Sequence, residues 1–167
     1  MRQKLVHDSS ILCVALSFNN QSIASGSDDG LVLVWDVSSA SVTRRLGAHS
    51  GSVTGVSVSS DGKGEIEALA SCSKETICVW NAASDRPVLT LQHSGANGIS
   101  FSPNKKHLAS WSSDQTVRIW NAETGQLMQT LEGHASQVMA VCYSEDGALV
   151  ASGSTDLSVK IWTGATS

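Results

Sequence analysis

Apolar and polar residues alternate along the chain in short segments. Residues 52–59 read "SVTGVSVS", and the segments "VRIW" (117–120) and "VKIW" (159–162) combine β-branched residues with a tryptophan. Clusters of Ser, Asp, Asn and Gly separate such segments, for example "NAETG" (121–125) and "SEDG" (144–147). No stretch keeps an apolar period of 3.6 residues long enough for a helix. The pattern therefore predicts an all-β protein.

Four tryptophans mark an internal repeat. They are separated by 45, 40 and 42 residues, and four histidines follow at similar intervals of 42, 44 and 41. A serine stands ten residues, and an aspartate six residues, before three of the tryptophans. The positions are Trp35, Trp80, Trp120 and Trp162; His7, His49, His93 and His134; Ser25, Ser110 and Ser152; and Asp29, Asp114 and Asp156. Several features on one period predict four copies of one structural unit.

Each copy has room for four short strands. One follows the histidine, one ends near the serine, one ends at the tryptophan, and one precedes the next histidine. We expect a single repeat domain over residues 1–167, with unit boundaries near 7–48, 49–92, 93–133 and 134–167. Residues 1–6 stand where an outermost strand is expected, with no unit of their own before them.

The repeat resembles the WD40 family. Residues 130–162, "TLEGHASQVMAVCYSEDGALVASGSTDLSVKIW", are close to that family's consensus, and the likeness covers nearly the whole chain. The resemblance implies β-propeller blades, each a four-stranded antiparallel sheet. The sequence departs from the pattern in places: Trp-Asp occurs only at Trp35-Asp36, and Gly-His only at Gly133-His134.

The resemblance also implies a role for the repeated polar residues. In WD40 proteins the matching tryptophan indole, serine hydroxyl, histidine and turn aspartate form a buried hydrogen-bonded chain. Each buried polar group needs a partner, because an unpartnered one costs about 1–3 kcal/mol. The same residue types could form a hydrolase triad. An active site is needed only once, however, and this set recurs, so the repetition favours the structural role.

The second unit departs from the others. Ser71 lies nine residues before Trp80, and Lys74 stands where aspartate is expected. Either Glu75 replaces the missing carboxylate, or His49 and Ser71 lack an acidic partner. The unit also carries an insertion at 63–68. We expect this change to be sequence drift, with a binding feature as the alternative.

Composition narrows the function further. The chain has 11 basic and 15 acidic residues with no run of either sign, which argues against a nucleic-acid partner or a membrane surface. The longest apolar run, 11–16, is far shorter than the roughly 20 residues that span a bilayer. Four cysteines lack CxxC spacing, and His107, outside the repeat, has no ligand partner at useful spacing. We therefore expect no metal, no cofactor, and a cytoplasmic or nuclear location.

The two ends of the repeat are expected to be open. WD40 propellers typically have seven or eight blades, so four leave two apolar sheet faces uncovered. Three outcomes remain: two chains pair head to tail into an eight-bladed ring, the chain is part of a longer array, or four blades close as a monomer. The paired ring, in which residues 1–6 complete the last blade of the other chain, is favoured.

The resemblance implies a non-enzymatic scaffold that binds other proteins or peptides. Candidate contacts lie beside the histidine loops and aspartate turns; they are Asp28, Ser52, Ser113, Gln137 and Thr155. The alternative is a sensor or substrate-recognition fragment of a larger signalling or ubiquitin-ligase protein. An enzyme with a site in the channel ranks last, because no unit carries a unique acid–base or metal set.

Overall fold

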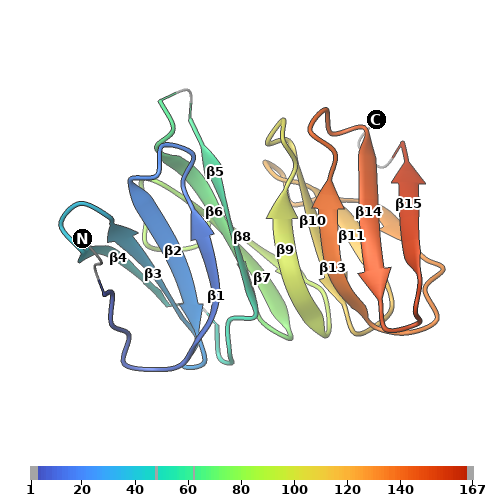
Figure 1. Ribbon diagram of the computed structural model, residues 1–167, viewed down its shortest axis with the longest axis horizontal. Coiled ribbons are helices and arrows are strands. Elements are labelled where there is room, and N and C mark those ends of the chain that lie inside the picture. The colour runs from blue at the N-terminus through green and yellow to red at the C-terminus, as the bar shows by residue number, and fades with distance from the viewer. Residues whose placement is uncertain (1–3, 48, 62, 165–167) are drawn as a thin grey trace.

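The computed structural model describes residues 4–47, 49–61 and 63–164, and within these ranges it contains strands and no helix. Four antiparallel sheets follow one another in a row (Figure 1). The first sheet holds β1 (Ile11–Leu16), β2 (Ser22–Ser27), β3 (Leu31–Asp36) and β4 (Ser41–Gly47); the second holds β5 (Gly55–Ser60), β6 (Ile66–Cys72), β7 (Thr76–Asn81) and β8 (Leu89–Gln92). The third holds β9 (Ala96–Phe101), β10 (His107–Ser112), β11 (Val117–Asn121) and β12 (Leu127–Leu131); the fourth holds β13 (Val138–Tyr143), β14 (Leu149–Ser154) and β15 (Val159–Thr163).

The all-β prediction is confirmed, and each sheet is a simple meander in which sequence neighbours pair. The first three sheets have the predicted four strands, whereas the fourth has three among the described residues. Lys4–Val6 is not in a strand and is not paired with β15. The remainder of the predicted closing strand, residues 1–3, lies outside the described part. The first and fourth sheets lie at opposite ends of the row (Figure 1), so the closed four-bladed form is not the one observed.

The hydrophobic core lies between the sheets. A first cluster joins the first and second sheets, a second joins the second and third, and a third joins the third and fourth. The second and third sheets each send one set of alternating side chains forward to the next sheet and the other set back to the previous one, as period-two strands require. Val34 of β3 and Val56 of β5, for example, share the first cluster.

Trp111 of β10 fills space that its paired strand leaves empty. It is paired with Gly98 of β9, and its side chain packs against the cluster between the third and fourth sheets. A Cβ atom at Gly98 would overlap the Trp111 ring. The large residue therefore depends on a neighbour without a side chain.

Substituting Gly98 with alanine is expected to destabilise the fold by about 1–3 kcal/mol, because the ring must move out of a packed interface. Urea unfolding followed by tryptophan fluorescence measures the change. Gly51→Ala is the control, since a Cβ there meets nothing within 4 Å. Adding Trp111→Leu to Gly98→Ala should recover part of the loss. Equal stabilities of the two single variants would contradict this interpretation.

Candidate functional site

One hydrogen-bonded arrangement recurs inside all four sheets. The tryptophan Nε1–H donates to the serine Oγ, and the same hydroxyl bonds one ring nitrogen of the histidine. The Trp–Ser distances are 2.8 Å for Trp35–Ser25, 3.1 Å for Trp80–Ser71, 2.8 Å for Trp120–Ser110 and 2.9 Å for Trp162–Ser152. The His–Ser distances are 2.8 Å for His7, 2.8 Å for His49, 2.7 Å for His93 and 2.8 Å for His134. We call this set the Trp–Ser–His clasp.

The fourth sheet extends the clasp to a carboxylate. His134 Nδ1 lies 2.7 Å from Asp156 Oδ2, and the same oxygen accepts the Ala135 N–H at 2.9 Å. The Ser158 hydroxyl donates to the other oxygen at 2.6 Å. These bonds, that from Ser158 first, hold the pKa of Asp156 well below its ordinary value. The loop before β13 is thereby tied to the turn between β14 and β15.

The third sheet makes the same links with the ring turned around. His93 presents Nδ1 to the serine, and its Nε2 lies 3.2 Å from Thr116 Oγ1 and 3.4 Å from Asp114 Oδ2. Arg118 also faces Asp114, at 3.5 Å. The segment between β8 and β9, residues 93–95, is shorter than the matching segments 48–54 and 132–137 of the neighbouring sheets.

Among the described residues, neither His7 of the first sheet nor His49 of the second forms a hydrogen bond with a carboxylate. Asp29 accepts instead from the Ser27 hydroxyl at 2.6 Å and from the Leu31 N–H at 3.2 Å. His49 bonds Thr76 Oγ1 at 3.0 Å, so Glu75 does not replace the missing aspartate. Of the two alternatives for the second unit, the structure favours a histidine without an acidic partner.

Sequence inspection missed a further hydroxyl residue that bonds the clasp histidine. A hydroxyl residue stands four positions before three of the four tryptophans, and each bonds the local histidine. These residues are Thr76, Thr116 and Ser158, at 3.0, 3.2 and 3.3 Å. The first sheet has Leu31 at this position. The recurring hydroxyl was visible in the sequence and explains how the second sheet retains a partner for its histidine.

The clasp residues are poorly suited to catalysis. The four serines are buried, and each hydroxyl already bonds both an indole and an imidazole. Burial lowers the pKa of His49 and of His93 to about 4 from an ordinary 6.5. A nucleophile must reach its substrate, and these serines are enclosed by their own sheet.

The predicted contact residues lie at one end of the sheets. This loop face consists of the turns after β2, β6, β10 and β14 together with the segments that lead into β1, β5, β9 and β13. Asp28 accepts a hydrogen bond from Ser52 of the next sheet at 2.6 Å. Ser113 donates to the Gly95 carbonyl at 3.3 Å, and the Thr155 N–H donates to the Gln137 carbonyl at 3.1 Å. These bonds tie neighbouring loops together.

Leu157 is an apolar side chain on the loop face that sequence inspection missed. It is 98% exposed and has a φ of 68°. The corresponding turn residues are Gly30 and Gln115, which also have positive φ. This backbone conformation favours glycine, so a leucine here costs some stability. The signal in the sequence was a leucine directly after the turn aspartate.

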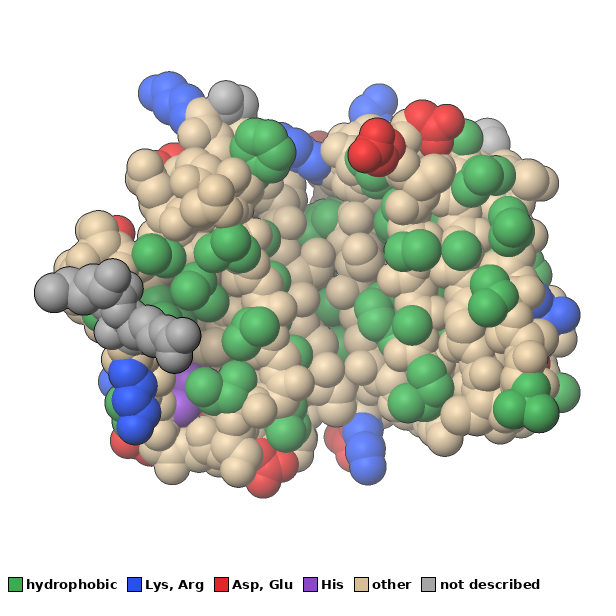
Figure 2. All heavy atoms as spheres, viewed as in Figure 1, with side chains coloured by type: hydrophobic (Ala, Val, Ile, Leu, Met, Phe, Trp, Pro, Cys, Tyr) green, Lys and Arg blue, Asp and Glu red, His purple; other side chains and the backbone are tan. Residues whose placement is uncertain are grey.

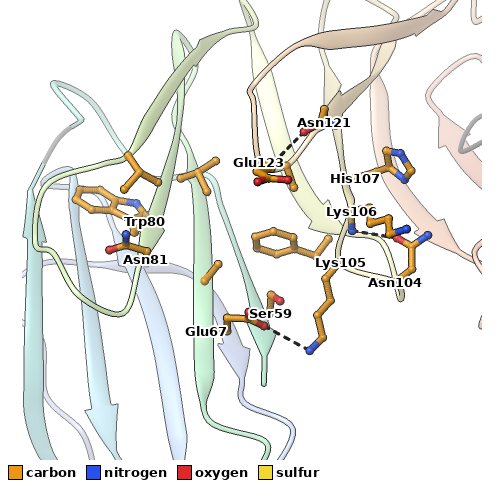
Figure 3. Close-up of a pocket in the computed structure, with 15 residues that line it drawn as sticks. Ser59, Glu67, Trp80, Asn81, Asn104, Lys105, Lys106, His107, Asn121 and Glu123 are labelled. Atoms are coloured by element: carbon orange, nitrogen blue, oxygen red, sulfur yellow. Dashed lines mark hydrogen bonds and ion pairs between the residues drawn. The ribbon is translucent and has the colours of Figure 1, made fainter. Parts of the chain in front are cut away.

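A cleft of about 890 Å³ opens at the other end, between the second and third sheets (Figure 3). Lys105 reaches across it from the third sheet toward Glu67 of the second, with 3.5 Å between Nζ and Oε2. His107 points away from the cleft (Figure 3), and burial lowers its pKa. An ion pair therefore spans the cleft between the two sheets.

The described residues contain no group of three or more His, Cys, Asp or Glu side chains placed to hold a metal ion. Within the same part of the chain no helix has the length and apolar character to cross a membrane. The cysteines at 13, 72, 78 and 142 are free thiols.

Comparison with models of known protein families shows to which family this chain belongs. The profile described as "WD domain, G-beta repeat" matches residues 2–36, 40–81, 85–121 and 125–163. The chain belongs to the WD40 repeat family. Each of the four matched ranges contains one Trp–Ser–His clasp. The second WD40 repeat is matched although it lacks the turn aspartate.

Two fungal relatives and one plant relative illustrate the similarity. Nuclear distribution protein nudF 1 of Talaromyces marneffei is 36% identical over an alignment of 146 positions, which covers 84% of this chain and 31% of the relative. Nuclear distribution protein PAC1 of Arthroderma otae is 33% identical over 170 aligned positions, gaps included, which cover 93% of this chain and 36% of the relative. Autophagy-related protein 16 of Arabidopsis thaliana is 26% identical over 159 aligned positions, which cover 93% of this chain and 30% of the relative. The chain spans about a third of the length of these relatives.

Removing one hydroxyl of a WD40 clasp should weaken the fold. Ser152→Ala leaves Trp162 Nε1 and His134 Nε2 without their partner, and the expected loss is about 1–3 kcal/mol of unfolding free energy. Urea denaturation checks it. Ser144→Ala is the control, because that serine bonds within an exposed turn and should cost less. A larger effect of the control would contradict the structural role of the clasp.

The buried histidines predict a loss of stability in mild acid. The folded pKa of His93 is about 4, against 6.5 without burial, so between these values the unfolded chain binds more protons. The stabilisation is complete above about pH 6.5 and is lost as the pH falls toward 4. Urea midpoints measured from pH 7 to pH 4.5 should fall, and His93→Gln should reduce the slope. A flat profile for the unsubstituted protein would overturn this expectation.

Proposed function

We propose that this chain is a non-catalytic scaffold that binds other proteins or peptides through its loop face. The observation that carries the proposal is the repetition of the clasp in every sheet. Its histidines and serines are used to hold strands together, so they are not free for chemistry. The loops, which are held by this framework of sheets, are therefore the part of the chain that can contact a partner. Binding residues commonly lie on loops that a rigid scaffold positions.

The family and the named relatives support this proposal. WD40 repeats build propellers that act as platforms for other proteins, and the relatives are named for nuclear distribution and autophagy. Because the chain spans about a third of their length, a sensor or recognition fragment of a larger protein is the second form of the same proposal. The proposal also includes a cytoplasmic location and assembly either as a paired ring or within a longer array.

An enzyme and a nucleic-acid binder are less well supported. Catalysis needs one unrepeated set of acid, base and nucleophile, and the cleft between the second and third sheets offers Lys105 already facing Glu67. Nucleic-acid binding needs clustered positive charge, whereas the formal net charge is −4. Protein partners suit this surface better.

Leu157 is the apolar anchor that we propose for the loop face. The matching residue Gln115 is exposed although a further sheet follows it, so exposure at this position does not require an open end. Thr155 and Ser158 of the same turn are polar, and an apolar anchor within a polar rim is a common arrangement at protein interfaces. A leucine kept in a glycine-favouring conformation is consistent with a functional constraint.

Replacing Leu157 with glycine should lower partner binding without lowering stability. Glycine relieves the positive φ, whereas the loss of a buried leucine side chain at an interface costs about 1.5–3 kcal/mol, or roughly tenfold or more in affinity. The measurement is quantitative mass spectrometry of proteins from a lysate of the source organism that are retained by the immobilised chain.

Gln115→Gly is the matched control, because it makes the same backbone change in the third sheet. We expect it to retain the captured proteins at the level of the unsubstituted chain. Equal capture by the Leu157→Gly variant, or capture no greater than that by an unrelated propeller, would remove the basis for the proposed surface.

A further inference from the structure

The open front face of the fourth sheet repeats a surface that is buried everywhere else in the chain. Val159 and Ile161 stand three and one residues before Trp162 and are 74% and 69% exposed. The same positions in the other sheets are fully or almost fully buried against the following sheet; they are Val32 and Val34, Ile77 and Val79, and Val117 and Ile119. The front face therefore has the composition of an interior surface.

The open rear face of the first sheet is the counterpart. Val14 pairs with the clasp serine Ser25, and Leu16 pairs with Ile23; they are 66% and 51% exposed. The residues at the same register in the later sheets pack back on the preceding sheet; they are Val56 and Val58, Ile99 and Phe101, and Val141 and Tyr143. Figure 2 shows hydrophobic side chains gathered over β1 at one end and over β13 and β14 at the other.

The two faces also match in shape. Between the first two sheets, Val53 lies over Gly26, and Val53 stands four residues after a clasp histidine. On the open front face Gly153 takes the place of Gly26, with nothing near its Cβ position, beside a hollow of about 180 Å³. On the rear face Ile11 takes the place of Val53, four residues after His7, and is exposed.

The edge of β15 offers a third match. The outermost strands of the first three sheets each bury one leucine, namely Leu46, Leu91 and Leu131, and the described part of the fourth sheet has no such strand. Leu5 precedes His7 by two residues, as Leu91 precedes His93. His7 is held by the first sheet through Ser25, as His49 is held by the second sheet through Ser71. The segment before His7 is thus placed to lie along the outermost strand of a sheet that packs against the rear face of the first sheet.

We propose that the front face of the fourth sheet is occupied by the rear face of the first sheet of a second copy of this chain. Ile11 of that copy fills the hollow at Gly153, and its Leu5 segment pairs with the edge of β15 that no described strand covers. The reciprocal contact closes an eight-bladed ring with twofold symmetry. The inference rests on the assembly proposed above and identifies the surfaces and the partner.

A second copy suits the observations better than an unrelated partner. A partner that covers the front face of the fourth sheet must present two apolar side chains arranged like Val14 and Leu16, and one apolar side chain placed like Ile11. It must also supply a strand for the edge of β15. One surface of this chain has all of these features. A ring of eight blades lies within the known range of propellers, and closed symmetric assembly is the usual outcome for complementary ends.

The test is the mass of the 17.5 kDa chain by light scattering after size exclusion. We expect twice the chain mass for the unsubstituted protein. Val14→Lys on the rear face and Ile161→Lys on the front face should each reduce it to one chain mass. Both sites are exposed in the single chain, so circular dichroism should show an unchanged fold.

Mixing the two variants distinguishes head-to-tail pairing from other arrangements. In a 1:1 mixture the intact front of one variant meets the intact rear of the other, so a species of two chain masses should reappear. Both substitutions add lysine, so the mixture creates no new opposite-charge pair. Met128→Lys on the outermost strand β12 is the control and should leave the paired mass unchanged.

Three results would overturn the inference: one chain mass for the unsubstituted protein, masses that grow beyond two chains with concentration, or no complementation between the two variants. The capture experiment is independent of these outcomes. Leu157→Gly should lose partner proteins while it keeps the paired mass, so failure of the assembly and failure of the proposed scaffold function give different results.

Discussion

Every sheet in this chain has apolar side chains on both of its faces, and this constraint governs the rest of the structure. A small sheet with two apolar faces cannot be stable alone in water, so it must be covered on both sides. The inner sheets meet the requirement with their neighbours, as the clusters around Val56 and Ile99 show. The position of the core, the exposed ends and the location of the loop face all follow from this need for cover.

The hydrogen bonds within sheets and the packing between sheets tolerate sequence change differently. The clasp accepts replacement, since His49 bonds Thr76 alone on the side where the histidines of the third and fourth sheets also face a carboxylate. Packing between sheets couples distant residues, because Trp111 requires Gly98 on the paired strand and also contacts the next sheet. Drift in the polar residues of one repeat is therefore compatible with a well-packed row of sheets.

The repeat predicted the four sheets, their strands and the Trp–Ser–His links, because each depends on residues within one period. It did not predict the hydrogen bonds of Asp29. Two residues after the turn aspartate, the third and fourth sheets have a hydroxyl residue that bonds both the aspartate and the histidine, whereas the first sheet has Leu31. The cleft spanned by Lys105 and Glu67 was not predicted either, since it brings together turns of different sheets. Leu157 escaped notice because its exposure depends on backbone direction at a single turn residue.

The opposite ring orientations of His93 and His134 have a consequence for their protons. In each clasp the serine oxygen accepts from the indole and can give its own proton to the nearer imidazole nitrogen. The other nitrogen then carries hydrogen toward the acidic side chain. His134 is accordingly the Nδ1–H tautomer and His93 the Nε2–H tautomer. Two histidines in equivalent positions of one repeat thus have their nitrogen roles exchanged, which nitrogen magnetic resonance distinguishes.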